Sequence, residues 1–253
     1  MSNARSVALR GGRPDARSAV LVLHGGREHS HSPTSPWQLS YVRMFDFYHG
    51  LRRAAPECAV YVLRYRFRGW NAGSGPRGRS EPDPVSDARW ALDRISADVP
   101  GVPIALLGHS MGGRTAFAIA DAPGVVGICA LAPWLPEGEP VPGYRPEQRF
   151  VIAHGTADRM TSATLSRTYA TRLRAQGAAV ARFELAGARH ALLDRSSLWR
   201  EFAVATALGL VGERAVPAGV AAALRQTKDA GLAVDLAAYA APPDASSHPS
   251  LTG

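Results

Sequence analysis

The chain has 253 residues, of which 46% are hydrophobic and 20% charged, and its basic residues exceed its acidic ones by eight. This composition is that of a globular protein, and it excludes wholesale disorder, collagen and coiled coil. No apolar run approaches the roughly 18 residues of a membrane span, and the charged N-terminus has no apolar stretch behind it, so we expect neither a span nor a secretory signal. Cys58 and Cys129 lie in apolar runs, which favours buried free thiols and a cytoplasmic protein.

The excess of positive charge does not predict a nucleic-acid partner. Of the 29 basic residues all but Lys228 are arginines, and they are dispersed among 21 acids without a basic block. A nucleic-acid-binding protein more often shows a basic helix or stripe with interleaved aromatic residues. We therefore expect a small-molecule partner and no nucleic acid or membrane.

Short apolar runs bounded by Gly and Pro alternate with segments of helical spacing. We expect buried strands at 19–23, 59–63, 103–107, 125–131, 150–153 and 180–185. We expect helices at roughly 37–54, 84–98, 111–121, 162–176 and 195–210. This alternation predicts an α/β fold with a mainly parallel sheet, helices on both faces, and ligands bound beyond the carboxyl ends of the strands.

The chain is predicted to form one α/β domain over residues 1–210. The Ala-rich stretch that follows is expected to add a helical extension within residues 211–253. The last 13 residues, APPDASSHPSLTG, are rich in Pro and Ser and are predicted to be disordered.

The third expected strand runs into the pattern G-x-S-x-G at residues 108–112, with helical spacing after it. This is the pattern of a nucleophile elbow, a sharp strand-to-helix turn that projects a serine at the edge of the sheet. Ser110 would then lie at a helix N-terminus, where free N–H groups favour developing negative charge. We expect Ser110 to be a nucleophile.

A nucleophilic serine needs a base, and the base needs an acid that orients it. Asp158 follows the fifth expected strand and His190 follows the sixth, so both fall in loops at carboxyl ends of strands and come after the serine in the order acid, then histidine. We therefore predict the triad Ser110, Asp158 and His190. His154 is expected to be an ordinary half-buried histidine, and Asp194 to cap the final helix.

An oxyanion needs two backbone donors aimed at the carbonyl oxygen. Met111, the residue after the nucleophile, is expected to supply one N–H, and the loop after the first expected strand the other. That loop begins with His24-Gly25-Gly26, in which glycine lets the backbone approach a ligand closely. We expect Gly26 to be the donor, with Gly25 as the alternative.

Two other patterns point to cofactors and are rejected. His29 and His31 form H-x-H in a polar loop, but no third ligand stands at metal spacing. Residues 73–78 match G-x-G-x-x-G, but the prolines that follow forbid the helix that a dinucleotide site requires. We expect no metal and no cofactor.

Arg64, Arg66 and Arg68 alternate along the end of the second expected strand. Three like charges on one face cannot stay buried unpaired, so the strand must end near residue 63 or 64. Either these arginines pair with acids such as Glu81, Asp83 and Asp87 and brace the loop, or one of them recognises an anionic group of a ligand.

Together these motifs make the sequence similar to the α/β-hydrolase family, and to its small, lidless, dienelactone-hydrolase-like and carboxylesterase-like members. The resemblance covers roughly residues 18–210 and is carried by the glycines after the first strand, the elbow, and the loops that hold Asp158 and His190. It implies acyl transfer to water, with Gly26 and Met111 stabilising the oxyanion. Many relatives insert a helical lid after the fourth strand, but the prolines of 136–146 exclude a helix there.

The resemblance therefore predicts a serine hydrolase that cleaves a carboxylic ester or thioester of a small soluble substrate. Two alternatives stay open. An acyltransferase or cyclase would use the same acyl-enzyme with a nucleophile other than water, and a non-catalytic binding protein could keep the fold alone.

Overall fold

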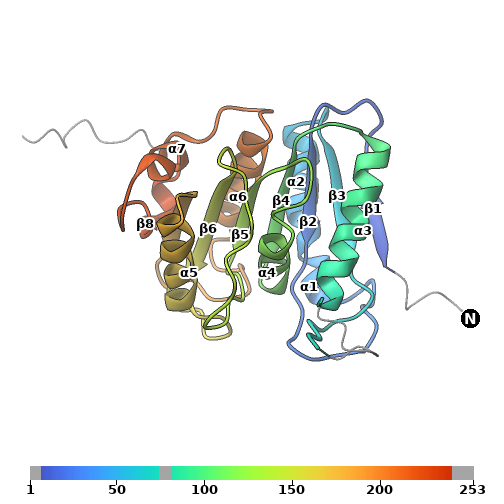
Figure 1. The fold of residues 1–253 in the computed structure, drawn as a ribbon, viewed down its shortest axis with the longest axis horizontal. Coiled ribbons are helices and arrows are strands. Elements are labelled where there is room, and N and C mark those ends of the chain that lie inside the picture. The colour runs from blue at the N-terminus through green and yellow to red at the C-terminus, as the bar shows by residue number, and fades with distance from the viewer. Residues whose placement is uncertain (1–6, 74–80, 241–253) are drawn as a thin grey trace, which may run out of the picture.

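The computed structural model describes residues 7–73 and 81–240, which form one eight-stranded sheet between two layers of helices (Figure 1). The strands lie in the order β1-β3-β2-β4-β5-β6-β7-β8, and each pair of neighbours is parallel except β1 with β3. Their bounds are β1 (Ala8–Gly11), β2 (Ala19–Leu23), β3 (Ala59–Arg64), β4 (Ile104–His109), β5 (Val125–Leu131), β6 (Arg149–Gly155), β7 (Ala179–Leu185) and β8 (Val234–Asp235).

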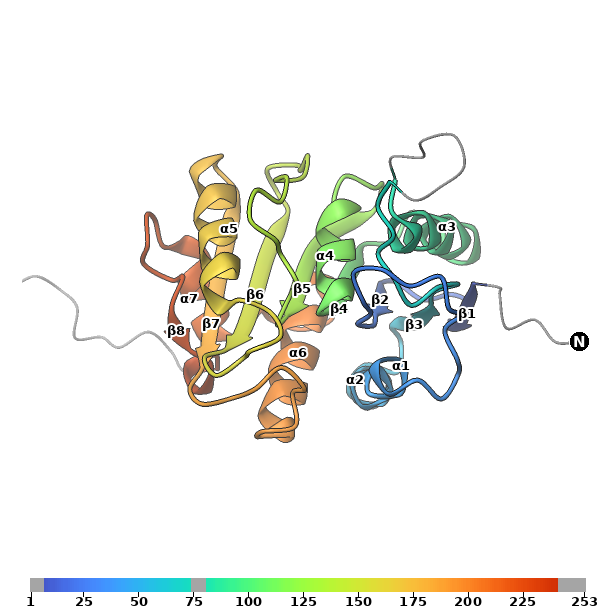
Figure 2. The ribbon, with the colours of Figure 1, turned by 90° about the horizontal axis from the view of Figure 1, so that it is seen from below.

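Helices cover both faces of this sheet (Figure 2). One face carries α3 (Asp83–Asp98), α4 (Met111–Ala118) and α5 (Ala163–Ala175). The other carries α1 (Leu39–Val42), α2 (Met44–Ala54), α6 (Ser196–Leu210) and α7 (Ala218–Arg225). The architecture is therefore the α/β fold with a mainly parallel, doubly covered sheet that the alternation of apolar runs and helical segments predicts.

The core lies in two layers because each central strand is buried on both faces. Along β2, Leu21 and Leu23 pack under α3 and α4, while Val20 and Val22 pack under α2. Alternate residues of a strand point to opposite faces, so a short run of consecutive apolar residues serves both cores at once.

The register of the sheet brings the ends of the central strands together. Leu23 at the end of β2 pairs with Leu63 of β3 and with Gly108 of β4. His109 pairs with Leu131 at the end of β5. The loops that follow β2, β3, β4 and β5 therefore all begin at one edge of the sheet.

Several elements differ from those that the sequence predicts. The first expected helix is divided at Arg43 into α1 and α2, and the helix after the elbow ends at Ala118, a few residues early. The strands β1 and β8 are additional, and β8 extends the sheet beyond β7. The helix α7 lies within the range 211–253, where the sequence predicts a helical extension. The tail predicted to be disordered, 241–253, lies outside the described residues, as does most of the 73–78 pattern.

The segment between β5 and β6 contains no helix, so the domain has no helical lid. Prolines interrupt it repeatedly, and its only regular features are turns near Gly138 and Glu147. None of the helices in the described ranges is long and apolar enough to cross a membrane.

Candidate active site

Ser110 lies at the sharp turn between β4 and α4, with a backbone φ of 56°. A non-glycine residue in this region is strained, and such strain persists only where the surroundings hold it. Here the N–H of Ser110 donates to the carbonyl of Leu131 (3.0 Å), and its carbonyl accepts from the N–H of Gly113 (3.0 Å) and of Trp134 (3.1 Å). The turn is thus fixed from both sides and presents the Ser110 hydroxyl at the edge of the sheet.

Glycines make the turn possible because neighbouring backbone passes very close. A Cβ on Gly108 would collide with the backbone of Gly112, and a Cβ on Gly112 would collide with the carbonyl of Leu23. The two glycines of G-x-S-x-G therefore let β4, α4 and the end of β2 approach one another.

The structure brings the three residues of the predicted triad into one hydrogen-bonded chain. Nε2 of His190 lies 3.0 Å from the Ser110 hydroxyl, and Nδ1 lies 2.7 Å from Oδ2 of Asp158. Asp158 is fully buried and the His190 side chain is 10% exposed. With the proton on Nδ1, the imidazole donates to the carboxylate and accepts from the serine hydroxyl, as a general base requires.

Asp158 accepts more hydrogen bonds than the one from His190. Its Oδ1 accepts from the backbone N–H of Met160 (2.8 Å) and of Thr161 (3.0 Å), while the hydroxyl of Thr161 donates to Oδ2 (2.8 Å). Nε2 of His154 lies 3.3 Å from Oδ2. Burial alone would raise the pKa of Asp158, but the hydrogen bonds from His154, His190 and Thr161 outweigh it and hold the pKa well below its usual range.

His154 and Thr161 are site residues that the sequence analysis missed. His154 is fully buried rather than half-buried, and burial lowers its pKa, so the ring is neutral and can donate from Nε2 to Asp158. A histidine four residues before a candidate acid in the same loop was a usable signal. The contact with Thr161 depends on how the loop folds, which spacing alone does not reveal.

The side chain of His109, inside the elbow, contacts the loop that carries His190. Its Nε2 lies 3.0 Å from the carbonyl oxygen of His190, and the two rings stack at a tilt with centroids 4.9 Å apart. It therefore holds the loop that carries the base. Asp194 is not the cap of α6, since Arg195 occupies that position and Asp194 accepts from the backbone and the guanidinium of Arg189.

Gly26 and Met111, expected to supply the oxyanion donors, lie against each other beside the nucleophile. A Cβ on Gly26 would collide with the side chain of Met111 and with the carbonyl of Arg68. Met111 is the first residue of α4, so its N–H has no partner within the helix. Gly25 is also close, and a Cβ there would lie 3.2 Å from Cβ of Ser110.

A small cavity of about 200 Å³ opens over the nucleophile. Its lining combines the serine, the histidine and three separate loops: Gly26, Arg27, Glu28, Ser110, Trp134, Met160, Thr161 and His190. The loops that follow β2 and β5 thus both contribute to it.

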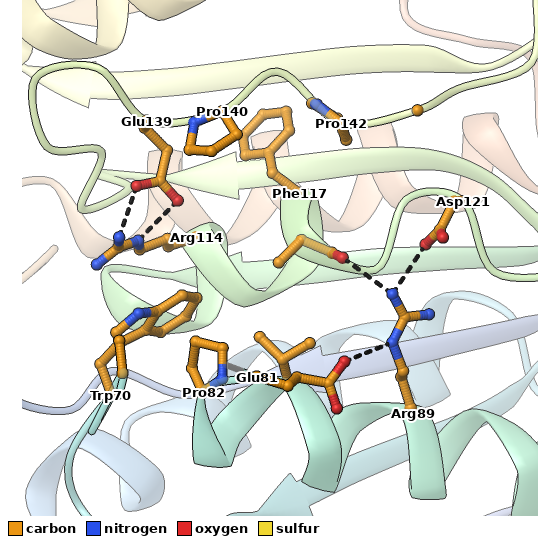
Figure 3. A pocket seen from close by; sticks show the side chains of 14 residues that line it. Trp70, Glu81, Pro82, Arg89, Arg114, Phe117, Asp121, Glu139, Pro140 and Pro142 are labelled. Atoms are coloured by element: carbon orange, nitrogen blue, oxygen red, sulfur yellow. Dashed lines mark hydrogen bonds and ion pairs between the residues drawn. The ribbon is translucent and has the colours of Figure 1, made fainter. Parts of the chain in front are cut away.

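Residues between β3 and α3 line a different cavity, of about 440 Å³, between α3, α4 and residues 139–143 (Figure 3). An ion pair between Arg114 and Glu139 (2.6 Å) stands on one side of it, and Arg89 bridges Glu81 and Asp121 on another. The charged side chains that line it within residues 7–73 and 81–240 are thus all bound to one another.

Arg114 connects the wall of this cavity between α3 and α4 to the wall of the small cavity over Ser110. Its guanidinium lies 4.1 Å from the ring centroid of Trp70 and 4.5 Å from that of Trp134, and the two indole rings are themselves in edge-to-face contact. The two cation–π contacts and the ion pair with Glu139 leave the guanidinium little freedom. Arg114 therefore fixes the position of Trp134, which lines the cavity over Ser110.

The alternating arginines at the end of β3 and just beyond it brace the loop that follows, which is the first of the two roles considered for them. Arg66 binds Asp87 (2.5 Å) and lies 3.8 Å from Asp83. Arg64 and Arg68 donate to the carbonyls of Thr34 and Pro33, respectively. Glu81 is bound to Arg89 instead of to these arginines.

Among residues 7–73 and 81–240, no group of three or more His, Cys, Asp or Glu side chains is placed to hold a metal ion. His29 lies 3.6 Å from Glu28, and the His31 ring lies edge-on to that of Phe67.

Comparison with known proteins assigns the chain to one family. The model of the alpha/beta hydrolase family matches residues 20–249, and the chain belongs to that family. No curated protein sequence matches the chain.

Solved structures of α/β hydrolases share the fold at low sequence identity. A serine hydrolase without a lid from Xanthomonas campestris is 19% identical, with a TM-score of 0.56, over 80% of this chain and 87% of that one. Esterase 2 of Thermogutta terrifontis phosphonylated by cyclosarin is 19% identical, with a TM-score of 0.59, over 83% and 90%. The monoacylglycerol lipase of Paleococcus ferrophilus is 18% identical, with a TM-score of 0.55, over 83% and 100%.

Proposed function

We propose that this protein is a serine hydrolase that cleaves a carboxylic ester or thioester of a small soluble substrate. The observation that carries the proposal is the continuous hydrogen-bonded chain from Ser110 through His190 to Asp158. A hydroxyl 3.0 Å from an imidazole that a buried carboxylate orients is the arrangement that activates a serine.

In the first half-reaction, Oγ of Ser110 attacks the carbonyl carbon while Nε2 of His190 takes its proton. The oxyanion that forms accepts from the backbone N–H groups of Gly26 and Met111. Collapse breaks the bond to the leaving oxygen or sulfur, which receives the proton from His190, and leaves an acyl group on the serine. A water molecule then attacks the acyl-enzyme with His190 again acting as the base, which releases the acid and restores Ser110.

The environment of Asp158 favours this cycle. Its depressed pKa keeps it ionised throughout, so it stabilises the imidazolium that forms on each proton transfer. The open cavity and the lack of a helical lid favour soluble substrates over an interface. Two of the similar structures are an esterase and a monoacylglycerol lipase, which agrees with ester hydrolysis.

The first test is covalent labelling. A fluorophosphonate probe should add one mass increment to the intact protein, and Ser110→Ala should prevent the addition. His190→Ala should slow labelling strongly, since the base is lost while the serine remains. A wild-type protein that is not labelled would favour a non-catalytic binding protein on the same fold.

A second measurement separates hydrolysis from acyl transfer. With p-nitrophenyl acetate as donor, the released p-nitrophenol and acetate should match mole for mole. Release of p-nitrophenol in excess of acetate, once an alcohol or amine acceptor is added, would identify an acyltransferase instead.

A further inference from the structure

A larger open cavity lies beside the catalytic one. Its volume is about 590 Å³, and it shares His190 and Met160 with the small cavity over the nucleophile. Among the described residues, Ser110 and Gly26 line only the smaller of the two. The larger cavity therefore adjoins the site on the side of the base, away from the expected oxyanion donors.

The side of the base is where a leaving group must lie. His190 gives its proton to the departing oxygen or sulfur, so that atom has to come within hydrogen-bond reach of Nε2. The rest of the leaving group extends from there. The cavity next to His190 is thus placed to receive the alcohol or thiol part of the substrate.

The lining of this cavity is apolar with a positive charge. Met160 and Leu193 are 77% and 65% exposed, so both apolar side chains are accessible to a ligand in the cavity. Arg189 is bound to Asp194 (3.1 Å). Arg159 is exposed and makes no ion pair or hydrogen bond within the described part of the chain. The lining contains two arginines and one aspartate, so its net charge is +1. Because Arg189 is paired with Asp194, the unpaired charge is the guanidinium of Arg159.

The turn that presents Arg159 is fixed by the triad itself. Oδ1 of Asp158 accepts from the N–H groups of Met160 and Thr161, which closes a tight turn over residues 158–161. The side chain of Asp158 is buried at the start of that turn, while Arg159 and Met160 are exposed. The residue that orients the base therefore also sets the backbone from which the free cation extends.

We propose that this cavity binds the leaving group, and that it selects an alcohol or thiol with an apolar or aromatic body and a carboxylate at its far end. The body packs on Met160 and Leu193, and Arg159 receives the carboxylate, for which the guanidinium fork is suited. A monoanion balances the single net charge of the lining. The inference rests on the proposed function, because it assumes that His190 protonates a leaving group.

Two esters with the same acyl group test it. 4-Acetoxybenzoate and 4-acetoxybenzamide place a carboxylate or a neutral amide at the same position on an aromatic leaving group. Release of the phenol, measured by chromatography, gives kcat/KM for each. Comparing the ratio of the two values between variants cancels their different intrinsic reactivities.

Arg159→Ala should lower the ratio for carboxylate over amide about fivefold, the upper end of what an exposed ion pair contributes. Arg159→Lys should keep part of the ratio, and Arg159→Glu should lower it further. The matched control is Arg53→Ala, because Arg53 is exposed near the end of α2, at the opposite edge of the sheet. It should leave the ratio unchanged. Raising NaCl from about 0.05 M to about 1 M should shrink the wild-type ratio, because salt screens exposed charges.

The outcomes separate this inference from the proposed function. The proposed function stands if wild type hydrolyses 4-acetoxybenzamide and Ser110→Ala does not. If Arg159→Ala then leaves the carboxylate-to-amide ratio unchanged, the leaving-group inference is wrong. An equal loss on both esters in Arg159→Ala also overturns it, since that loss has no charge selectivity. If wild type hydrolyses neither ester and resists the fluorophosphonate, both proposals fail.

Discussion

Mild acid should destabilise this protein, at pH values well above those at which its carboxylates titrate. His24 and His109 are almost completely excluded from water. The pKa of His24 is lowered from 6.5 to about 4, mainly by burial and to a smaller extent by the nearby Arg64 charge, against the opposing effect of the hydrogen bond with the Gly25 carbonyl. Burial also lowers the pKa of His109 to about 3, with the charges of His190 and Arg43 acting in the same direction.

The sign and size follow from proton linkage. Because both pKa values are lower in the folded state, the unfolded chain takes up these protons first. The stability is therefore complete above pH 6.5 and is lost as the pH falls towards 4 and 3. At pH 5 each unfolded imidazole is almost fully protonated while each folded one is neutral, which costs about 2 kcal/mol per histidine. Relative to a typical free energy of unfolding of about 5–15 kcal/mol, a loss of about 4 is large.

Urea unfolding followed by circular dichroism at several pH values between 7.5 and 5 measures this loss directly. His24→Gln should lower stability at every pH, because the backbone N–H of Tyr65 loses its contact with Nε2, but it should reduce the loss between pH 7.5 and 5 by about 2 kcal/mol. The control is His49→Gln, which removes an exposed imidazole and should leave the pH dependence as it is. A wild-type free energy of unfolding that is flat from pH 7.5 to 5 would refute the reasoning.

Three further changes test the site and its supports. Gly112→Ala forces a Cβ onto the carbonyl of Leu23, so we expect loss of soluble protein or a melting temperature lower by several degrees in a thermal scan. His154→Phe keeps the buried ring but removes a donor to the triad carboxylate, and it should lower kcat about tenfold with little change in KM; an unchanged kcat would mean that the contact only fills space. Arg66→Ala removes the cationic partner of the buried Asp87 carboxylate, so the melting temperature should fall. The value of kcat/KM should fall by the same factor for both acetoxy esters. A selective loss on the charged ester would instead identify Arg66 as a recognition residue.

The body of the fold could be predicted because each central strand is an uninterrupted apolar run between Gly or Pro residues. The elements that were missed lack that signal. β1 is a half-exposed edge strand, and β8 consists of two residues, so neither shows a periodicity that could be recognised. The division of the first helix at Arg43 also leaves no Pro or Gly in the sequence to mark it.

The candidate site divides in the same way. Ser110, Asp158 and His190 could be named because each follows an apolar run, and the carboxyl ends of parallel strands meet at one edge. The partners of Asp158 could not be named in full, because the approach of Thr161 depends on the folding of one turn. The sequence likewise offered Arg66 three acids within reach, and only packing decides that it binds Asp87 most closely.

The turn over residues 158–161 has a consequence for how such an enzyme can diversify. Asp158 is held through the backbone N–H groups of residues 160 and 161, which every amino acid except proline provides. The side chains at 159 and 160 are therefore not needed to keep the acid in place. Mutation can exchange them, and with them the lining beside the base, while the reactive groups keep their positions. Chemistry and choice of substrate can then evolve separately within four consecutive residues.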